Sequence, residues 1–325
     1  MSVKLPIGNI VYSPIQPMHI PDGFLSALVA AVFWVLSAIA VAYALRRVGK
    51  DLGERQVPLM GVLAAAIFAG QMLNFSVTGG TSGHLLGAAL ATILLGPWAA
   101  ILVLTSVVSI QALIFQDGGF LALGANLFNM AVIGVTVSYF VYTSMQKLAR
   151  GRSWGIFVGG FSAAWFSIVV ASLSAALQLA LSGTSPANIS VPAMGGIHML
   201  IGIGEGLITV GTLIFLYAAR RDLFHSRDAA PKGGAVVWIF GLGIALALAV
   251  LSPLASTHPD GLIWVAKQQG FLAAARAPLY KIIPSYIFPG IHNKSLATIV
   301  SGILGALLVF GVALGVAHFR RNKRT

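Results

Sequence analysis

Two histidine motifs hold the residues of this chain that are best suited to binding a metal. In "MHIPDGF" Met18 directly precedes His19, and "GGTSGHLLG" contains His84. If Met18 carries a free amine, that amine, the amide nitrogen of His19 and Nδ1 of its imidazole can chelate one ion. A nitrogen from His84 would complete a square plane, which favours Ni(II) or Cu(II), allows low-spin cobalt and disfavours tetrahedral Zn(II).

This metal chelate depends on the protonation of its ligands and on whether Met18 is the N-terminal residue. The amine and the imidazole must be deprotonated to bind, so metal affinity should fall at acid pH. If residues 1–17 stay attached, a peptide bond from Pro17 replaces the amine, and the site must be rebuilt from His19, His84 and His198. The chain has no Cys, which excludes disulfides and thiolate ligands.

The elements that position these residues are predicted to be membrane helices. The chain has 325 residues, 58% of them hydrophobic, and a mean hydropathy of +0.91, which no ordinary soluble domain reaches. A span needs about 20 apolar residues. Nine candidate spans cover about 23–45, 57–76, 83–95, 97–116, 121–145, 155–182, 194–219, 234–254 and 295–318.

These spans predict an all-α, polytopic membrane helical bundle. It would have about seven spans, followed by two C-terminal spans joined by a long outside loop, residues 255–294. The third span, 83–95, is short and is expected to be tilted, broken or buried among its neighbours. A polar linker, residues 222–233, separates a metal-binding domain, 18–221, from a C-terminal module, 234–325.

The basic residues predict the orientation of the bundle. If residue 22 lies outside and the spans alternate, most of the 20 Lys and Arg fall on the inside, around 46–55, 147–152, 220–232 and 320–324. This is the positive-inside pattern. We therefore expect a multi-pass protein of the cell (inner) membrane, with its N-terminus outside and its C-terminus in the cytoplasm. The net charge of +12 then reflects topology, and membrane lipid rather than nucleic acid is the expected surrounding.

The same topology brings further polar residues to the outer ends of the spans. Asn74, Ser82 and His198 lie there, and Glu205 lies about two turns deeper than His198. A metal-binding imidazole usually donates its other N–H to an acceptor, so these four residues are candidates for orienting the metal ligands. The ordinary alternatives are a histidine hydrogen-bonded at the interface and, for Glu205, a buried carboxyl bonded to a neighbouring span.

Three segments carry a resemblance to a known family. "MHIPDGFLS" (18–26), "NFSVTGGTSGHLLGAALA" (74–91) and "GGIHMLIGIGEGLIT" (195–209) closely resemble the nickel/cobalt substrate-binding membrane components of energy-coupling factor transporters, the CbiM/NikM family. The resemblance implies Met18, His19 and His84 as ligands of Ni²⁺ or Co²⁺, which is transported substrate rather than permanent cofactor. It also implies cytoplasmic ATP-binding (A) subunits and a transmembrane coupling (T) subunit as partners.

A second resemblance covers residues 253–325. "STHPDGLIWVAKQQGF" (256–271) is similar to a module of the NikN/PDGLE type, which implies a role in metal loading or coupling. The first resemblance also implies that the mature protein begins at Met-His. Residues 1–17 lack the apolar centre of a signal peptide, so we expect translation to start at Met18 and this extension to be absent from the mature protein.

Other classes of function remain as alternatives. The chain has no G-x-x-x-x-G-K-[ST] loop, so it is not expected to be an enzyme, and ATP hydrolysis would belong to the partner subunits. A proton-coupled secondary divalent-metal transporter would act without those subunits. A membrane metalloenzyme would need a carboxylate base beside the metal, and a vitamin-binding component would leave both histidine motifs unexplained.

Small residues on the first span could serve a partner. Ala27 and Ala31, and further on Ala38 and Ala42, recur at four-residue spacing and allow close approach of another helix. That face is predicted either to dock a partner subunit or to pack within the bundle.

Overall fold

The computed structural model describes residues 18–51, 56–224 and 234–322. The predicted extension, residues 1–17, and most of the predicted linker lie outside this part of the chain. The predicted helical membrane bundle is confirmed, because six helices are long and apolar enough to cross a membrane and two shorter apolar helices accompany them. The six long spans contain α1 (Ala27–Asp51), α4 (Pro97–Phe115), α6 (Gly134–Ala149), α7 (Trp154–Leu181), α8 (Ala187–Ala219) and α11 (Lys294–Asn322). The two shorter apolar helices are α2 (Gln56–Gln71) and α9 (Gly234–Leu251).

Shorter elements join these helices. The helix α5 (Leu123–Leu127) continues through a π-helical turn, η1 (Phe128–Ile133), into α6, so this span is continuous but locally widened. The others are α3 (Ala88–Leu95), α10 (Gly261–Gln268), the 3₁₀ turns η2 (Arg221–Phe224), η3 (Ser252–Leu254), η4 (Leu272–Ala274) and η5 (Pro284–Tyr286), and the antiparallel strands β1 (Phe75–Val77) and β2 (Thr81–Gly83).

The predicted short third span is built as part loop and part helix. Residues 84–87 are non-helical, and α3 has 8 residues. With a rise of up to about 3.3 Å per non-helical residue and 1.5 Å per helical residue, the segment from Gly83 to Leu95 can cover up to about 28 Å, close to the thickness of a bilayer core. The predicted break in this span is therefore a real feature of the fold.

Buried side chains satisfy the backbone where that segment is not helical. Glu205 of α8 accepts hydrogen bonds from the N–H groups of Leu86 (2.6 Å) and Gly87 (3.0 Å). The amide of Gln71 in α2 donates to the Leu86 carbonyl (3.0 Å). Unpaired backbone groups are costly at membrane depth, so these two side chains are what allows the chain to leave the helical form here.

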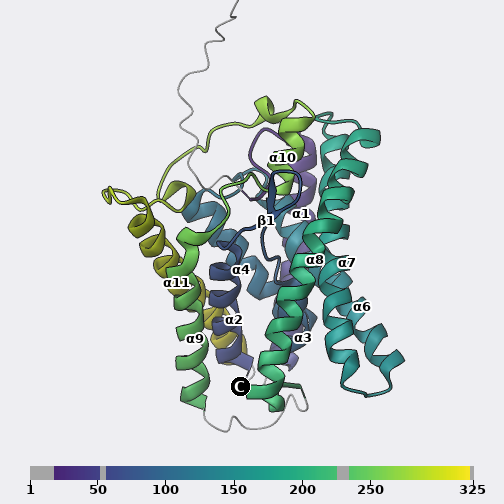
Figure 1. Ribbon diagram of the computed structural model, residues 1–325, viewed down its shortest axis with the longest axis vertical. Coiled ribbons are helices and arrows are strands. Elements are labelled where there is room, and N and C mark those ends of the chain that lie inside the picture. Colours follow the sequence, from purple (N-terminus) through teal and green to yellow (C-terminus); the bar gives the residue numbers. More distant parts are fainter. Residues whose placement is uncertain (1–17, 52–55, 225–233, 323–325) are drawn as a thin grey trace, which may run out of the picture.

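The C-terminal module packs its two helices against α2. Figure 1 shows α9 and α11 beside α2 on one side of the molecule, with α6, α7 and α8 on the other. The contact is close because small residues meet large ones. A Cβ at Gly305 of α11 would lie 2.1 Å from the Phe68 ring, and one at Gly241 of α9 would lie 2.3 Å from Val62.

Between α9 and α11 the module covers the end of the bundle that lies opposite the C-terminus (Figure 1). The amide of Ser82 in β2 donates to the Pro259 carbonyl (2.8 Å), and the Trp264 indole donates to the Gly79 carbonyl (3.0 Å). The helix α10 buries Leu262, Val265 and Ala266 against the bundle. Part of the predicted outside loop is thus a folded cap on the β1–β2 hairpin.

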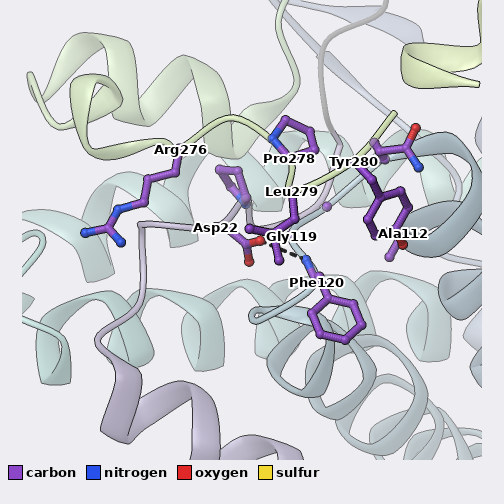
Figure 2. A pocket seen from close by; sticks show the side chains of 11 residues that line it. Asp22, Ala112, Gly119, Phe120, Arg276, Pro278, Leu279 and Tyr280 are labelled. Carbon is purple, nitrogen blue, oxygen red and sulfur yellow. Dashed lines mark hydrogen bonds between the residues drawn. The ribbon is translucent and has the colours of Figure 1, made fainter. Parts of the chain in front are cut away.

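The same module also runs across the N-terminal loop. Its Arg276 N–H donates to the Asp22 carbonyl (2.7 Å). A cavity of about 60 Å³ lies there, lined among others by Asp22, Phe120, Arg276, Pro278, Leu279 and Tyr280, and Figure 2 shows these side chains around it. Both carboxylate oxygens of Asp22 are occupied, since they accept hydrogen bonds from the N–H groups of residues 120–122. Asp22 therefore fixes two loops to each other.

Candidate metal centre

The N-terminal motif presents two nitrogens to one point. The Met18 nitrogen donates to Oδ1 of Asp117 (2.7 Å), and Nδ1 of His19 lies 3.2 Å from the same oxygen. These are two of the three nitrogens of the chelate predicted from the sequence. Because both face a single carboxylate oxygen, the loop holds them in the convergent arrangement that chelation of one ion needs.

Two neighbouring segments hold that loop in place. The side chain of Asn126 in α5 accepts from the Ile20 N–H (3.0 Å) and donates to the Ile20 carbonyl (3.1 Å). Gly118, at φ +97°, lies so close that a Cβ there would be 2.9 Å from Cβ of His19. The loop after α4 must therefore be free of a side chain at this position for the histidine to lie against it.

The ring of His84 lies beside the ring of His19. The two rings are edge to face, with centroids 5.6 Å apart. With metal–nitrogen bonds of about 2 Å, two imidazoles at neighbouring corners of a square plane have centroids about 4.5 Å apart, so His84 would approach His19 by about 1 Å to share an ion with it. Nδ1 of His84 donates to the Leu85 carbonyl (3.1 Å), which leaves Nε2 with its lone pair free for a metal.

The C-terminal module adds a carboxylate to this side of the site. Oδ1 of Asp260 lies 3.7 Å from Nε2 of His84. Its other oxygen accepts from the Leu262 N–H (3.2 Å) and caps α10. Asp260 is buried, so water screens the electrostatic interaction between its carboxylate and His84 only weakly.

A cavity of about 80 Å³ joins these residues to the interior of the bundle. Met18, His19, His84, His198 and Asp260 line it, together with residues of α5, η1, α7 and α8. His198 donates from Nδ1 to the Met194 carbonyl one turn earlier (2.8 Å), so its Nε2 also keeps a lone pair. A cavity of this size has room for a few water molecules or an ion.

The carboxylate of Asp117 dominates the electrostatics of the N-terminal loop. Burial by itself lowers the pKa of His19, but the charge and hydrogen bonds of Asp117 outweigh it and raise that pKa above its ordinary value. Burial raises the pKa of Asp117, yet His19, Tyr286 and the Met18 N–H together lower it. His19 must therefore give up a favourably held proton before Nδ1 can bind a metal.

The four residues proposed to orient the ligands have definite contacts. The hydroxyl of Ser82 donates to the His258 carbonyl (2.9 Å) and the Asn74 carbonyl accepts from the Ser256 N–H (2.8 Å), so both hold the C-terminal module. Glu205 binds backbone amides, the alternative expected for it. His198 lines the cavity. A direct role of these four in orienting the metal ligands stays a prediction.

Three site residues were not selected from the sequence. Asp117 and Asn126 flank the turn after the fourth span, and Asp260 lies in the predicted outside loop, residues 255–294. A usable signal was present for Asp117, because the alternating topology places it at the same end of the bundle as His19. Asp260 lies 176 residues from His84, and no local pattern connects them.

Within the described part of the chain, no three His, Asp or Glu side chains form a group that could hold a metal by themselves. The chelate predicted at Met18 and His19 draws on main-chain nitrogens as well as on an imidazole.

A helical membrane bundle with several nitrogen donors close together at one end is typical of membrane proteins that bind or transport metal ions. Comparison with known protein families identifies the family to which the chain belongs. Residues 19–223 match the CbiM family, described as the cobalt uptake substrate-specific transmembrane region, and residues 235–322 match the PDGLE domain. The chain belongs to the CbiM family and carries a PDGLE domain after it, which confirms both resemblances seen in the sequence.

Relatives and a solved structure agree with this assignment. The "Putative fused nickel transport protein NikMN" of Archaeoglobus fulgidus is 34% identical over 94% of this chain and 100% of its own length. The "Fused nickel transport protein NikMN" of Rhodobacter capsulatus is 31% identical over 91% of this chain and 96% of its own. A crystal structure of a truncated transition metal transporter is 36% identical, with a TM-score of 0.56, over 62% of this chain and 99% of that one.

Proposed function

We propose that this chain is the substrate-specific membrane component of an ATP-driven transporter of the energy-coupling factor type. It captures Ni²⁺ or Co²⁺ at the outer face of the membrane and delivers the ion to the cytoplasm. The observation that carries the proposal is the convergence of the Met18 and His19 nitrogens on one point, with the His84 ring 5.6 Å from that of His19.

The proposed ligands are the amine of Met18, the amide nitrogen and Nδ1 of His19, and Nε2 of His84. Four nitrogens in a plane suit Ni(II) or low-spin cobalt better than Zn(II). The metal-binding form then carries a free amine at Met18. When the ion binds, the Met18 amine, the His19 amide nitrogen and Nδ1 of His19 must each release a proton to solvent, and the Asp117 carboxylate remains beside the cation.

The proposed partners are a transmembrane coupling subunit and cytoplasmic ATP-binding subunits, with the N-terminus outside and the C-terminus in the cytoplasm. All four alanines of the first-span stripe, on α1, are exposed. This supports their prediction as a docking face, because they do not pack within the described bundle. The alternative, proton-coupled transport by this chain alone, has less support, since both oxygens of Glu205 already accept backbone hydrogen bonds.

Metal content and intact mass of the purified chain test the site. A chain that begins at Met18 should bind about one Ni²⁺ or Co²⁺, and His84→Ala should lose it, because the plane then lacks its fourth nitrogen. A chain that keeps residues 1–17 should bind far more weakly. Equal binding by both forms would contradict the amine ligand. Uptake into vesicles by the chain alone, without ATPase subunits, would favour the proton-coupled alternative.

A further inference from the structure

A tyrosine of the C-terminal module reaches the buried carboxylate of the N-terminal site. The hydroxyl of Tyr286 donates to Oδ2 of Asp117 (2.7 Å), across 169 residues of sequence. Tyr286 is 1% exposed and Asp117 is 2% exposed. Burial and the nearby carboxylate raise the pKa of Tyr286 well above its usual range, so the phenol keeps its hydrogen and acts as the donor.

The two oxygens of Asp117 face different parts of the protein. Oδ2 receives the Tyr286 hydroxyl, whereas Oδ1 faces the Met18 nitrogen and Nδ1 of His19. A carboxylate held at one oxygen has a fixed orientation at the other. A single side chain therefore connects the C-terminal module to two of the nitrogens proposed to bind the metal.

Tyr286 itself is held in an unusual conformation. Both Ser285 and Tyr286 have positive φ, +53° and +59°, which is rare for residues other than glycine and for a bulky side chain marks a constrained backbone. The ring stacks on Phe115 with centroids 4.9 Å apart and an interplanar angle of 17°.

The preceding residues are tied to the end of α4. The Ile283 N–H donates to the Ile114 carbonyl (3.0 Å), and the Ile282 N–H donates to the side chain of Gln116 (3.1 Å). These bonds set the position of η5 against the loop that carries Asp117. The tyrosine is thus aimed at the carboxylate by several independent contacts.

We propose that Tyr286 is a positioning residue through which the C-terminal module sets the affinity of the N-terminal metal site. Its hydrogen bond fixes Asp117, and Asp117 in turn aligns the chelating nitrogens and places a negative charge beside the bound cation. The inference rests on the proposed function, since it assigns to the module a direct effect on metal capture at Met18 and His19.

Tyr286→Phe tests this in the full chain with Met18 as its N-terminus. The variant keeps the aromatic stack and removes only the hydroxyl. We expect the Kd for Ni²⁺, measured by competition with a chromophoric chelator, to rise about tenfold, as for other partners of metal ligands. The ligand-field absorption of bound Ni²⁺ should change as well. Tyr280→Phe is the matched control, because Tyr280 lies in the same loop and is 38% exposed, and it should leave both measurements unchanged.

A double-variant comparison separates positioning from general loss of structure. Asp117→Asn should weaken binding, and adding Tyr286→Phe to it should cost little more, because the two residues act through one hydrogen bond. Additive losses would overturn the inference. So would a Tyr286→Phe chain with a lower melting temperature but the wild-type Kd and spectrum.

The outcome for the wild-type chain distinguishes the two proposals. If it binds Ni²⁺ and Tyr286→Phe binds it equally well, only the role of Tyr286 falls. If the wild-type chain with a free Met18 amine binds neither Ni²⁺ nor Co²⁺, the proposed function falls and this inference falls with it. Should Tyr286→Phe fail to fold, the Kd of Asp117→Asn decides, and an unchanged value would overturn the inference.

Discussion

At the scale of single residues, the buried acidic side chains are the informative feature of this chain. It has eight Asp and Glu. Among the acids whose side chains the structure describes, Asp22, Asp117, Glu205 and Asp260 are buried, and each makes a specific contact with a backbone amide or a histidine. Two of them, Asp117 and Asp260, face His19 and His84, and in a chain with 9% charged residues these two buried carboxylates support the proposed cation site.

Asp260 offers a test at this scale. Asp260→Asn should weaken Ni²⁺ binding about tenfold, because the charge 3.7 Å from Nε2 of His84 is lost. Asparagine still caps a helix well, so α10 should keep its stability. The measurement is the Kd by chelator competition together with the melting temperature.

Asp260→Ala is the companion variant, since it removes the charge and the cap. It should bind as weakly as the asparagine variant and also lose about 1 kcal/mol of stability. If Asp260→Asn binds as tightly as the wild type, the carboxylate serves only to cap α10.

The sequence identified the proposed metal ligands more readily than the residues that contact them. His19 and His84 were found because each lies in a compact motif whose neighbours are also diagnostic. Asp117 and Asp260 act through contacts that close only in three dimensions, 98 and 176 residues from the histidines they face. Hydropathy and spacing describe local segments, so they contain no information about which outer loop covers which helix end.

At the scale of elements, the entry to α3 is the least ordinary feature. Here the chain leaves the β1–β2 hairpin, passes His84 and begins α3 at Ala88, directly after Gly87 with φ +77°. Glu205 and Gln71 replace the missing helical hydrogen bonds. The sequence predicted a short span in this region, but it could not predict that an acid of α8 would complete its backbone.

Gly87→Ala tests how tightly this entry is built. An alanine at positive φ costs about 1–2 kcal/mol, and here its Cβ would also lie 2.8 Å from the buried side chain of Ile67. We expect a further loss of about 1–3 kcal/mol from overpacking, seen as a lower melting temperature in detergent.

Gly80→Ala provides the matched comparison. Gly80 has the same φ of +77°, but nothing lies within 4 Å of its Cβ position. It should therefore show the backbone cost alone. Equal losses of stability in the two variants would mean that Ile67 moves aside freely and that the entry to α3 is loosely packed.

At the scale of the whole molecule, the two family modules form one body around one site. The C-terminal module contributes α9 and α11 to the bundle beside α2 (Figure 1), and its Asp260 and Tyr286 contact His84 and Asp117 at the proposed metal site. The apolar runs of the sequence predicted the spans of each module. They did not predict the docking, because the contact depends on small residues that face large ones, such as Gly305 against Phe68.

This interface can be tested by cutting the connection between the modules. With a protease site placed within residues 225–233, the cleaved halves should remain together in detergent, because membrane helices that pack through glycines associate by close contact. Gly305→Leu should separate them, since a Cβ there already lies 2.1 Å from the Phe68 ring. Gly311→Leu, in the same helix with open space around its Cβ position, should not.

Co-purification of the halves is the readout, and Ni²⁺ affinity is measured on both variants before cleavage. If undocking of the C-terminal module by Gly305→Leu left metal affinity unchanged, the module would act only after capture, and neither Asp260 nor Tyr286 would belong to the capturing site.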